Sequence, residues 1–410
     1  MSNTASSMPP FTNPFRAGAG HRPPYLAGRK SEQSEFAKLL TQEVITDNLV
    51  LTGLRGVGKT VLLEELKPIA LSAQWMWVGT DLSETVSVSE ATLAQRLITD
   101  LAVVTAAIKI GETEAREIGF TGAREIVPVK LGYSVLMSIY ESTPGLIIDK
   151  LKAFFAAISP IVKKSGKRGI VFAYDEAQTL ADHAAKEQYP LSLLLDLFQS
   201  VQRQGIPFML LLVGLPTLFP KLVDARTYAE RMFRVMFLKQ LTEEESRDAI
   251  TKPIEAANCP VKFTSAAITA TYKHSGGYPY FIQFICREAY DAYSQKSSEG
   301  KSPSVPITEI IRKLDTDFFA GRWAKVTDRQ QELLYVIAKL DHQDDEFTVQ
   351  EVSTMSQNIL DKPFSRTHVS QMISQLIVAG LIYKDRHGKY LFAVPLMAGF
   401  IRRVMGEEQT

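Results

Sequence analysis

Cysteine is almost missing from this sequence of 410 residues, which contains only Cys259 and Cys286. The two cysteines have neither the close spacing of a structural zinc site nor the number that a disulfide framework needs. These two classes of small, cross-linked fold are therefore excluded. Because nothing requires oxidised thiols, we expect a reducing compartment and a cytoplasmic protein.

Long apolar runs are also lacking, and neither sign of charge is in excess. The longest runs, such as Met209–Val213, are far shorter than the roughly 20 residues that cross a bilayer. The sequence has 46 Lys and Arg residues and 45 Asp and Glu residues, so its net charge of +1 gives no overall attraction to nucleic acid or to an anionic membrane. We expect no membrane interaction.

Residues 1–22 lack the basic and apolar segments of a signal peptide and are rich in Ser, Pro and Gly. A segment of this composition buries too little apolar surface to offset the entropy of ordering. The sequence therefore predicts a disordered N-terminal arm over residues 1–22, with ordered structure from residue 23.

The sequence does contain a series of short, largely apolar segments separated by segments of helical spacing. The apolar segments cover residues 48–52, 75–79, 170–174 and 207–213. Strands that are apolar on both faces belong to a parallel sheet with helices on both sides. Residues 23–240 are thus predicted to form an α/β domain, in which the polar segment Gly111–Gly122 is a loop.

Strand signals cease after Leu241. Thr242 and Glu245 have the spacing of a capping box, and three helical segments make residues 241–293 an all-α module. Residues 294–325 are predicted to be a Ser-, Gly- and Lys-rich linker and a connecting helix. Residues 326–405 show three helices and then a β-hairpin, which is the order of a winged-helix domain.

The segment from Gly53 to Thr60 reads Gly-Leu-Arg-Gly-Val-Gly-Lys-Thr and matches the P-loop pattern G-x-x-x-x-G-K-[ST] at every fixed position. Glycines let the loop curl with its N–H groups inward, the lysine adds a cation, and the threonine offers a hydroxyl to Mg²⁺. An apolar strand precedes the motif and an amphipathic helix follows it, which a chance Gly-rich turn would lack. The residues predicted to bind ATP are Gly53, Arg55, Gly56, Val57, Gly58, Lys59, Thr60 and Val61.

A pair of acidic residues, Asp175 and Glu176, follows the apolar segment at residues 170–174. In open α/β sheets, ligands bind at the carboxyl ends of the strands. Asp175 is predicted to hold Mg²⁺ together with Thr60, and Glu176 to orient and deprotonate the attacking water. A helix N-cap followed by a first-turn Glu is the alternative. The P-loop earlier in the chain favours hydrolysis, with Lys59 in the catalytic set.

With these motifs in place, the chain resembles AAA+ ATPases of the branch that contains the STAND signalling ATPases and the origin-recognition ATPases, over residues 23–405. Two further segments carry the resemblance. Tyr-Leu-Ala-Gly-Arg at residues 25–29 is similar to the box that packs near adenine and ribose, and Gly-Tyr-Pro at residues 277–279 is similar to the Gly-x-Pro motif of the helical lid. The resemblance implies nucleotide contacts from Tyr25, Leu26, Arg29, Gly277 and Pro279.

Two departures from this family pattern concern the sensing of the γ-phosphate. The apolar segment at residues 207–213 is followed by Gly-Leu-Pro-Thr, so Thr217 is the nearest candidate for the polar sensor residue of the family. The lid segment has no sensor arginine. Both departures favour slow, regulatory hydrolysis over a fast motor.

Two basic clusters leave alternatives open. Arginines just before the lid could supply an arginine finger to a neighbouring subunit, or could form ion pairs with Glu230 and Asp224; they are Arg226, Arg231 and Arg234, with the first two as finger candidates. The second cluster could touch phosphate or could be a solvated helix end: Lys163, Lys164, Lys167 and Arg168.

The C-terminal region also leaves two roles open. Its third helix and its hairpin carry residues that could contact duplex DNA: Arg366, His368, Gln371, Gln375, Lys384, Arg386 and Lys389. Acidic residues in this region are at least as numerous as basic ones, so phosphate contacts alone would bind weakly. In STAND-like proteins such a domain often packs on the ATPase core instead.

Three functions are compatible with these residues. The first is an ATP-driven switch that controls homo-oligomerisation or the binding of a separate effector or partner protein. The second is a DNA-remodelling or loading ATPase of the origin-recognition or transposition-helper type. The third, a nucleotide-binding scaffold without hydrolysis, is disfavoured because the Asp175-Glu176 pair is intact.

Overall fold

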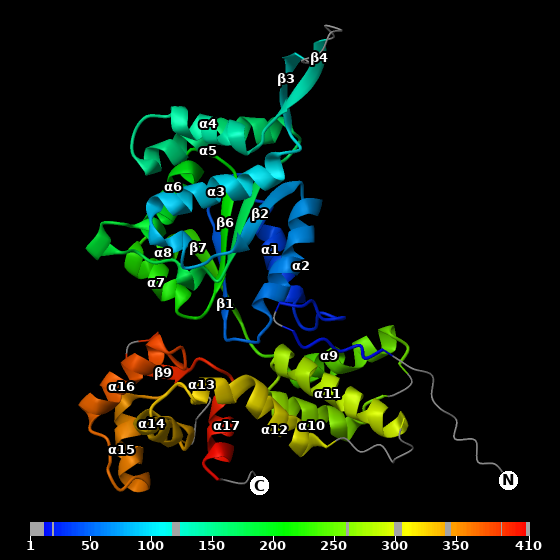
Figure 1. Ribbon diagram of the computed structural model, residues 1–410, viewed down its shortest axis with the longest axis vertical. Helices are drawn as coiled ribbons and strands as arrows, with labels where there is room; N and C mark the ends of the chain where they lie inside the picture. The colour runs from blue at the N-terminus through cyan, green and yellow to red at the C-terminus, as the bar shows by residue number, and fades with distance from the viewer. Residues whose placement is uncertain are drawn as a thin grey trace, which may run out of the picture. The chain divides into compact units, whose positions relative to one another are not determined.

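The computed structural model describes residues 12–18, 20–116, 124–259, 262–298, 306–340, 346–386 and 388–406 (Figure 1). The chain folds into two compact units. The sheet unit comprises residues 30–52 and 62–237, and the helical unit comprises residues up to 29, residues 53–61 and residues from 238 onward. The P-loop is therefore part of the helical unit, whereas Asp175 and Glu176 belong to the sheet unit.

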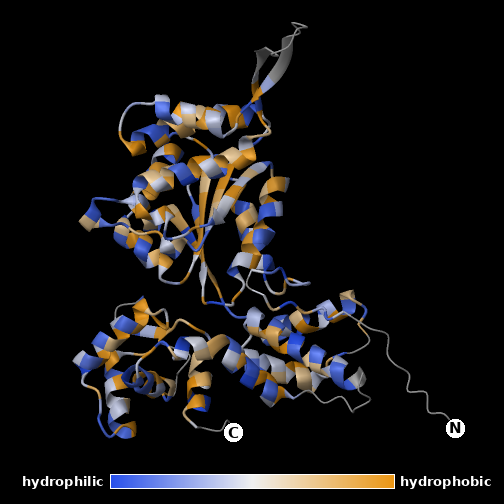
Figure 2. Cartoon of the chain, in the orientation of Figure 1, coloured by the Kyte–Doolittle hydropathy of each residue, from blue (hydrophilic) through white to orange (hydrophobic). Residues whose placement is uncertain are grey.

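A five-stranded sheet in the order β2-β5-β6-β1-β7 forms the centre of the sheet unit. β2 pairs with β5, β5 with β6 and β6 with β1, all in parallel. Every residue of β1, β5 and β6 is buried, which explains why their sequences are largely apolar (Figure 2). The strands are β1 (Asn48–Gly53), β2 (Trp75–Asp81), β5 (Gly169–Asp175), β6 (Phe208–Gly214) and β7 (Phe233–Leu238).

Helices cover both faces of this sheet, as the sequence predicted (Figure 1). On one face α1 (Lys30–Leu39) meets β2, where the rings of Phe36 and Trp77 are edge to face at 6.2 Å. On the other face an aromatic cluster fills the core, with Phe155 stacked on Phe172 at 5.3 Å. The remaining helices are α2 (Lys59–Ser72), α3 (Glu90–Thr105), α4 (Tyr133–Ser142), α5 (Ile147–Lys164), α6 (Pro190–Arg203), α7 (Leu218–Ala225) and α8 (Ala229–Met232). Short turns η1 (Val86–Val88), η2 (Ala177–Thr179) and η3 (Ala184–Lys186) complete the unit.

A β-hairpin replaces part of the predicted loop at Gly111–Gly122. β3 (Lys109–Arg116) pairs with β4 (Arg124–Lys130) in antiparallel register. The prediction was wrong as far as residue 116, and residues 117–123 lie outside the described residues. The polar sequence of β3 has neither an apolar run nor a regular apolar alternation, so hydrophobic periodicity could not reveal it.

Three helices at the start of the helical unit form the predicted all-α module: α9 (Glu243–Ala256), α10 (Ser265–Ser275) and α11 (Pro279–Ser298). The capping box predicted at Thr242 is confirmed. Its hydroxyl accepts from the N–H of Glu245, and the Glu245 carboxylate accepts from the N–H of Thr242 at 2.8 Å. We call these three helices the lid.

The N-terminal segment is ordered further toward its start than its composition predicted. Phe15 is buried, and its ring lies 5.5 Å from that of Tyr290 and 6.1 Å from that of Phe263. Asn13 donates to the carbonyl of Arg287 at 2.9 Å. The disordered arm predicted over residues 1–22 is therefore wrong for the residues from 12 onward that are described. One large aromatic side chain docks this polar segment, and composition alone does not show such an anchor.

The C-terminal region follows α12 (Ile307–Leu314), the π-helical turn η4 (Asp315–Ala320) and α13 (Gly321–Trp323). It contains the three helices and the hairpin that the sequence predicted, and then a final helix. Its elements are α14 (Asp328–Ala338), α15 (Val349–Ile359), α16 (Arg366–Val378), β8 (Ile382–Arg386), β9 (Lys389–Phe392) and α17 (Met397–Val404).

One hydrophobic core joins the lid to the C-terminal region. Phe281 of α11 lies 6.0 Å from Phe319 of η4, and Phe319 stacks on Phe400 of α17 at 5.1 Å. All three side chains are buried, and the cluster continues through α14 and α16. The lid and the C-terminal region thus share their apolar interior.

Candidate nucleotide site

The P-loop curls between the end of β1 and the start of α2, and its glycines are required by its shape. Gly56 and Gly58 have φ angles of 77° and 93°, in a region that side chains other than glycine rarely adopt. A Cβ on Gly56 would lie 3.2 Å from Cβ of Tyr280. Lys59 Nζ donates to the carbonyls of Gly53 at 2.8 Å and Leu54 at 3.0 Å, so the ammonium group lies over the curled loop.

The segment before α1 holds the P-loop from one side within the helical unit. The Arg29 guanidinium is buried and donates to the carbonyls of Val57 at 3.0 Å and Lys239 at 2.9 Å. Arg29 therefore contacts the P-loop backbone. Tyr25 packs against the cluster around Ile250 and Ile254, and Leu26 beside it is half-buried.

The lid contacts the P-loop through its Gly-Tyr-Pro segment. The N–H of Tyr280 donates to the carbonyl of Gly56 at 3.2 Å, and Pro279 Cγ would lie 3.9 Å from a Cβ on Gly58. Gly277 accepts from the N–H of Leu241 at 2.8 Å. The structure thus brings Pro279 to the P-loop, whereas Gly277 contacts Leu241, and it adds Tyr280, which the sequence did not single out.

Two arginines near the P-loop have only neutral partners in the described part of the chain. Arg55 donates to the carbonyl of Gly380, between α16 and β8, at 3.3 Å. Arg322 donates to the carbonyl of Phe318 and lies over its ring, 4.5 Å from the centroid. Burial, and then the nearby charge of Arg55, lower the pKa of Arg322. Arg322 is 43 residues beyond Pro279 of the lid motif, so local sequence gave no signal for it.

The acidic pair lies at the end of β5 in the sheet unit, with Asp175 as the last residue of the strand and Glu176 next to it. Asp175 is buried, and its Oδ1 accepts from the N–H of Glu176 at 2.7 Å. Glu176 is exposed and has a left-handed backbone, with φ 52°. Its carboxylate accepts from Nε2 of Gln178 in η2. In the described part of the chain, no group of three or more His, Cys, Asp or Glu side chains is placed to hold a metal ion.

Comparison with known proteins identifies the fold. The structure is similar to the Walker-type ATPase PABY2304 of Pyrococcus abyssi, with a TM-score of 0.56 and 14% identity over 93% of this chain and 97% of that one. It is also similar to the ADP form of the ORC2 protein of Aeropyrum pernix, with a TM-score of 0.54 and 14% identity over 94% and 97% of the two chains. The chain has a Walker-type ATPase fold. The predicted fold class is therefore confirmed.

Comparison of the sequence, in contrast to that of the structure, matches only the C-terminal part of the chain. A family model described as a domain of unknown function, DUF8462, matches residues 316–401, which include most of η4 and most of the C-terminal region. No curated protein matches the sequence. Among the described residues, no helix has the length and apolar character needed to cross a membrane.

The arginines before the lid have different partners from those that the sequence suggested. Arg226 forms a two-pronged ion pair with Asp196 at 2.9 and 2.8 Å, and Tyr228 also donates to this carboxylate. Burial alone would raise the pKa of Asp196, but these hydrogen bonds outweigh it and lower the pKa. Arg234 pairs with Glu35 at 3.0 Å. Arg231 is exposed and has no side-chain partner among the described residues.

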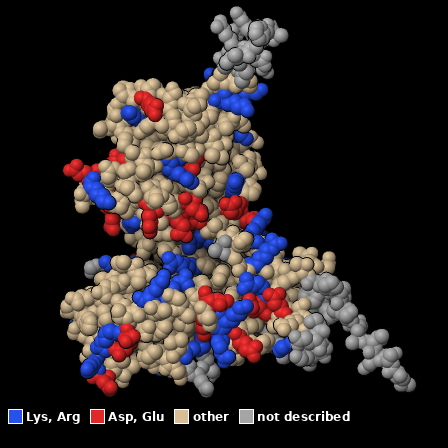
Figure 3. Space-filling model, in the orientation of Figure 1, with Lys and Arg blue, Asp and Glu red and all other residues tan. Residues whose placement is uncertain are grey.

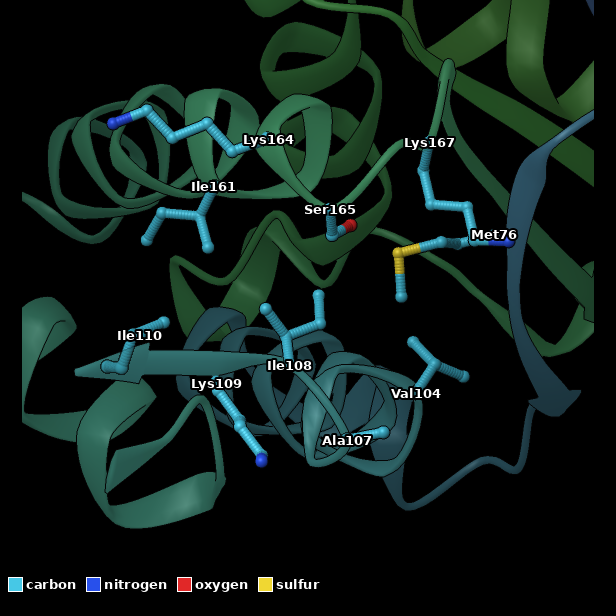
Figure 4. Close-up of a pocket in the computed structure, with 10 residues that line it drawn as sticks. All are labelled: Met76, Val104, Ala107, Ile108, Lys109, Ile110, Ile161, Lys164, Ser165 and Lys167. Atoms are coloured by element: carbon cyan, nitrogen blue, oxygen red, sulfur yellow. The ribbon is translucent and has the colours of Figure 1, made fainter. Parts of the chain in front are cut away.

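A pocket of about 610 Å³ lies in the sheet unit beside β2, α3 and α5, at the second basic cluster (Figure 4). Its lining is largely apolar and includes Met76, Ile108 and Ile161. Lys164 contributes to its rim, but the ammonium group points away from these apolar side chains (Figure 4). Lys163, Lys164 and Arg168 are exposed, as expected for a solvated helix end.

Proposed function

We propose that the chain binds ATP with Mg²⁺ and hydrolyses it slowly, and that nucleotide occupancy acts as a switch on self-association or on the binding of a partner protein. The observation that carries this proposal is that both the lid and the C-terminal region contact the P-loop. Tyr280 donates to Gly56, and Arg55 donates to Gly380. A nucleotide that rearranges the P-loop would bind with one affinity when these contacts are made and with another when they are broken. Such a difference in affinity between two states is what a switch requires.

The P-loop fits a phosphate group. Its two positive-φ glycines give the curled backbone that such loops use, and Lys59 already lies over loop carbonyls that a phosphate would replace as its partner. The residues from Gly53 to Val61 would hold the phosphates. Arg29 supports the loop from behind, and Pro279 and Tyr280 would cover it on the lid side.

The Mg²⁺ ligands in this proposal are Thr60 and Asp175. Mg²⁺ usually binds through one or two protein groups together with substrate phosphates, so two side chains are enough. The ion, when bound, neutralises charge on the β- and γ-phosphates. Glu176 orients the attacking water and accepts its proton, and Lys59 stabilises negative charge on the transferred phosphoryl group.

Replacement of Lys59 by Ala tests nucleotide binding directly. Loss of the cation over the loop is expected to weaken ATP binding by about 100-fold, on the order of 3 kcal/mol for a charge-assisted contact with phosphate. Titration of a fluorescent ATP analogue measures the change. Lys67→Ala on the same helix is the matched control, because its side chain is exposed, and it should bind as the wild type does. Equal affinities in the Lys59→Ala and Lys67→Ala proteins would contradict the assignment.

Self-association is the second part of the proposal, with Arg231 as the residue that reaches a neighbouring copy. Arg226 is the weaker candidate because Asp196 already binds its guanidinium. Gel filtration with ATP should give a larger species for the wild type than for Lys59→Ala. Arg231→Ala should bind ATP normally and lose any turnover that rises with protein concentration.

A role on duplex DNA is a second candidate, favoured by one observation. The face of α16 that the sequence predicted to point outward is exposed, including Arg366, His368 and Gln371. Against it, positive and negative side chains are interspersed on the face in view (Figure 3). A DNA-loading ATPase would use this helix in the major groove of the duplex.

Replacement of Arg366 by Glu separates this second candidate from the switch. If α16 enters a groove, the wild type with ATP should bind duplex DNA with an affinity that falls steeply as salt rises, and Arg366→Glu should weaken binding about 10-fold or more. Fluorescence anisotropy at several salt concentrations measures both. Absence of salt-sensitive binding by the wild type would eliminate the DNA role and leave the switch.

A further inference from the structure

Gln178 lies two residues after Glu176, in η2, and its side-chain amide joins two functional segments of the sheet unit. Its Oε1 accepts from the N–H of Leu215 at 3.1 Å, and its Nε2 donates to the Glu176 carboxylate. A backbone N–H can only donate, so Leu215 fixes which end of the amide is the oxygen. The NH₂ group must then face Glu176.

The end of β6 is shaped to receive this amide. Gly214 is the last residue of β6, and a Cβ there would lie 2.5 Å from Oε1 of Gln178 and 3.4 Å from its backbone nitrogen. Lys221 Nζ donates to the carbonyl of Gln178 at 2.7 Å and holds the same residue from α7. Two hydrogen bonds, from Leu215 and from Lys221 of α7, together with the close approach that Gly214 permits, therefore fix Gln178 in place.

Glu176 itself has a constrained backbone. Its left-handed conformation costs about 1–3 kcal/mol for a residue with a side chain. The N–H of Thr179 donates to its carbonyl at 3.0 Å and the Thr179 hydroxyl at 2.9 Å, which stabilises the turn. Because the backbone of Glu176 is fixed, only the rotamer of its side chain can still change. The hydrogen bond from Gln178 restricts that rotamer.

We infer that Gln178 is a positioning residue, which holds the Glu176 carboxylate in the orientation used for water activation and connects it to the end of β6. This inference rests on the proposed hydrolysis of ATP. The family to which the sequence is similar has a polar sensor side chain after this strand, and this chain has Gly-Leu-Pro-Thr there. In its place the backbone N–H of Leu215 acts through Gln178, so a shift of the β6 end would move the catalytic carboxylate.

Gln178→Glu isolates the donated hydrogen bond. The substituted side chain has the same size and can still accept from Leu215, but it cannot donate to Glu176 and repels it. Turnover should fall about 10- to 100-fold because the base is misplaced, while ATP affinity stays within about twofold of the wild type. Gln204→Glu, the same change at an exposed position of the sheet unit, should leave turnover unchanged.

Hydrogen exchange gives a readout that needs no nucleotide. In the nucleotide-free protein, Gln178→Ala removes the acceptor of the Leu215 N–H and should speed its exchange about 10-fold or more, and Gly214→Ala should do the same by displacing the amide. The inference is overturned if Gln178→Glu turns over ATP as the wild type does while Glu176→Gln is inactive. It is also overturned if Leu215 exchanges equally in wild type and Gln178→Ala. Absence of turnover in the wild type would instead remove the proposed function.

Discussion

Glu176→Gln is expected to lower ATP turnover by about 10²–10⁴-fold and to leave ATP affinity within about threefold of the wild type. The amide keeps the shape of the side chain but cannot accept a proton from water. Affinity should persist because the contacts assigned to the phosphates come from the P-loop, which this change does not touch. Phosphate release under single-turnover conditions measures the chemical step, and a fluorescent ATP analogue measures binding.

Glu187→Gln is the matched control for this experiment. Glu187 is an exposed glutamate in the same unit with nearly the same left-handed backbone, φ 53°, but it follows η3, whereas Glu176 follows β5. The same loss of charge there should leave turnover at the wild-type rate. Equal turnover by Glu176→Gln and the wild type would remove Glu176 from the catalytic role and leave a protein that binds nucleotide without hydrolysing it.

Gly277→Ala is expected to destabilise the helical unit by about 2–4 kcal/mol. Its φ of 74° would strain any residue with a Cβ, which costs about 1 kcal/mol or more, and the added Cβ would lie 2.3 Å from the carbonyl oxygen of Leu241. That oxygen is backbone, and Leu241 is itself tied to Gly277 by a 2.8 Å hydrogen bond, so neither side can move alone. Chemical denaturation followed by hydrogen exchange of α10 and α11 measures the loss.

The neighbouring glycine provides the control for this substitution. Gly276 also has a positive φ, 57°, but the tightest contact of a Cβ there would be the end of the Leu396 side chain at 3.0 Å, with the Tyr278 ring at an ordinary 3.5 Å. That side chain can rotate, so Gly276→Ala should cost about 1 kcal/mol from backbone strain alone. A larger loss for Gly276→Ala than for Gly277→Ala would show that the contact with Leu241 is not the decisive one. ATP affinity should fall with Gly277→Ala, because Gly277 leads into the two lid residues that contact the P-loop.

The motifs could be read from the sequence because the residues of each lie side by side in the chain. Gly53–Thr60 has its spacing within eight residues, and Asp175-Glu176 directly follows the apolar residues 170–174 of β5. The order of helices and strands was also accessible, because apolar runs and helical spacing report burial directly. The hairpin β3–β4 was missed because its first strand has no apolar pattern.

The contacts between motifs could not be predicted, because they join residues far apart in sequence through side chains with no special local pattern. Tyr280 contacts Gly56, and Arg55 contacts Gly380 across 325 positions. Gln178 is close to the acidic pair in sequence, but its importance comes from Leu215, 37 positions later. Packing contacts between distant residues were equally hidden. Phe15 is buried because it packs against Phe263 and Tyr290, which lie far from it in the sequence.

The core shared by α11 and the C-terminal region limits how this protein can be dissected. A chain cut near residue 326 would leave Phe281 and Phe319 without the buried partners that α14, α16 and α17 supply. The lid fragment would then carry a wide apolar surface into water, and surfaces of that kind drive aggregation. The separate roles of the ATP site and the C-terminal region should therefore be tested by point substitutions in the intact chain. A truncated chain would lose activity because it aggregates, whatever the role of the part removed.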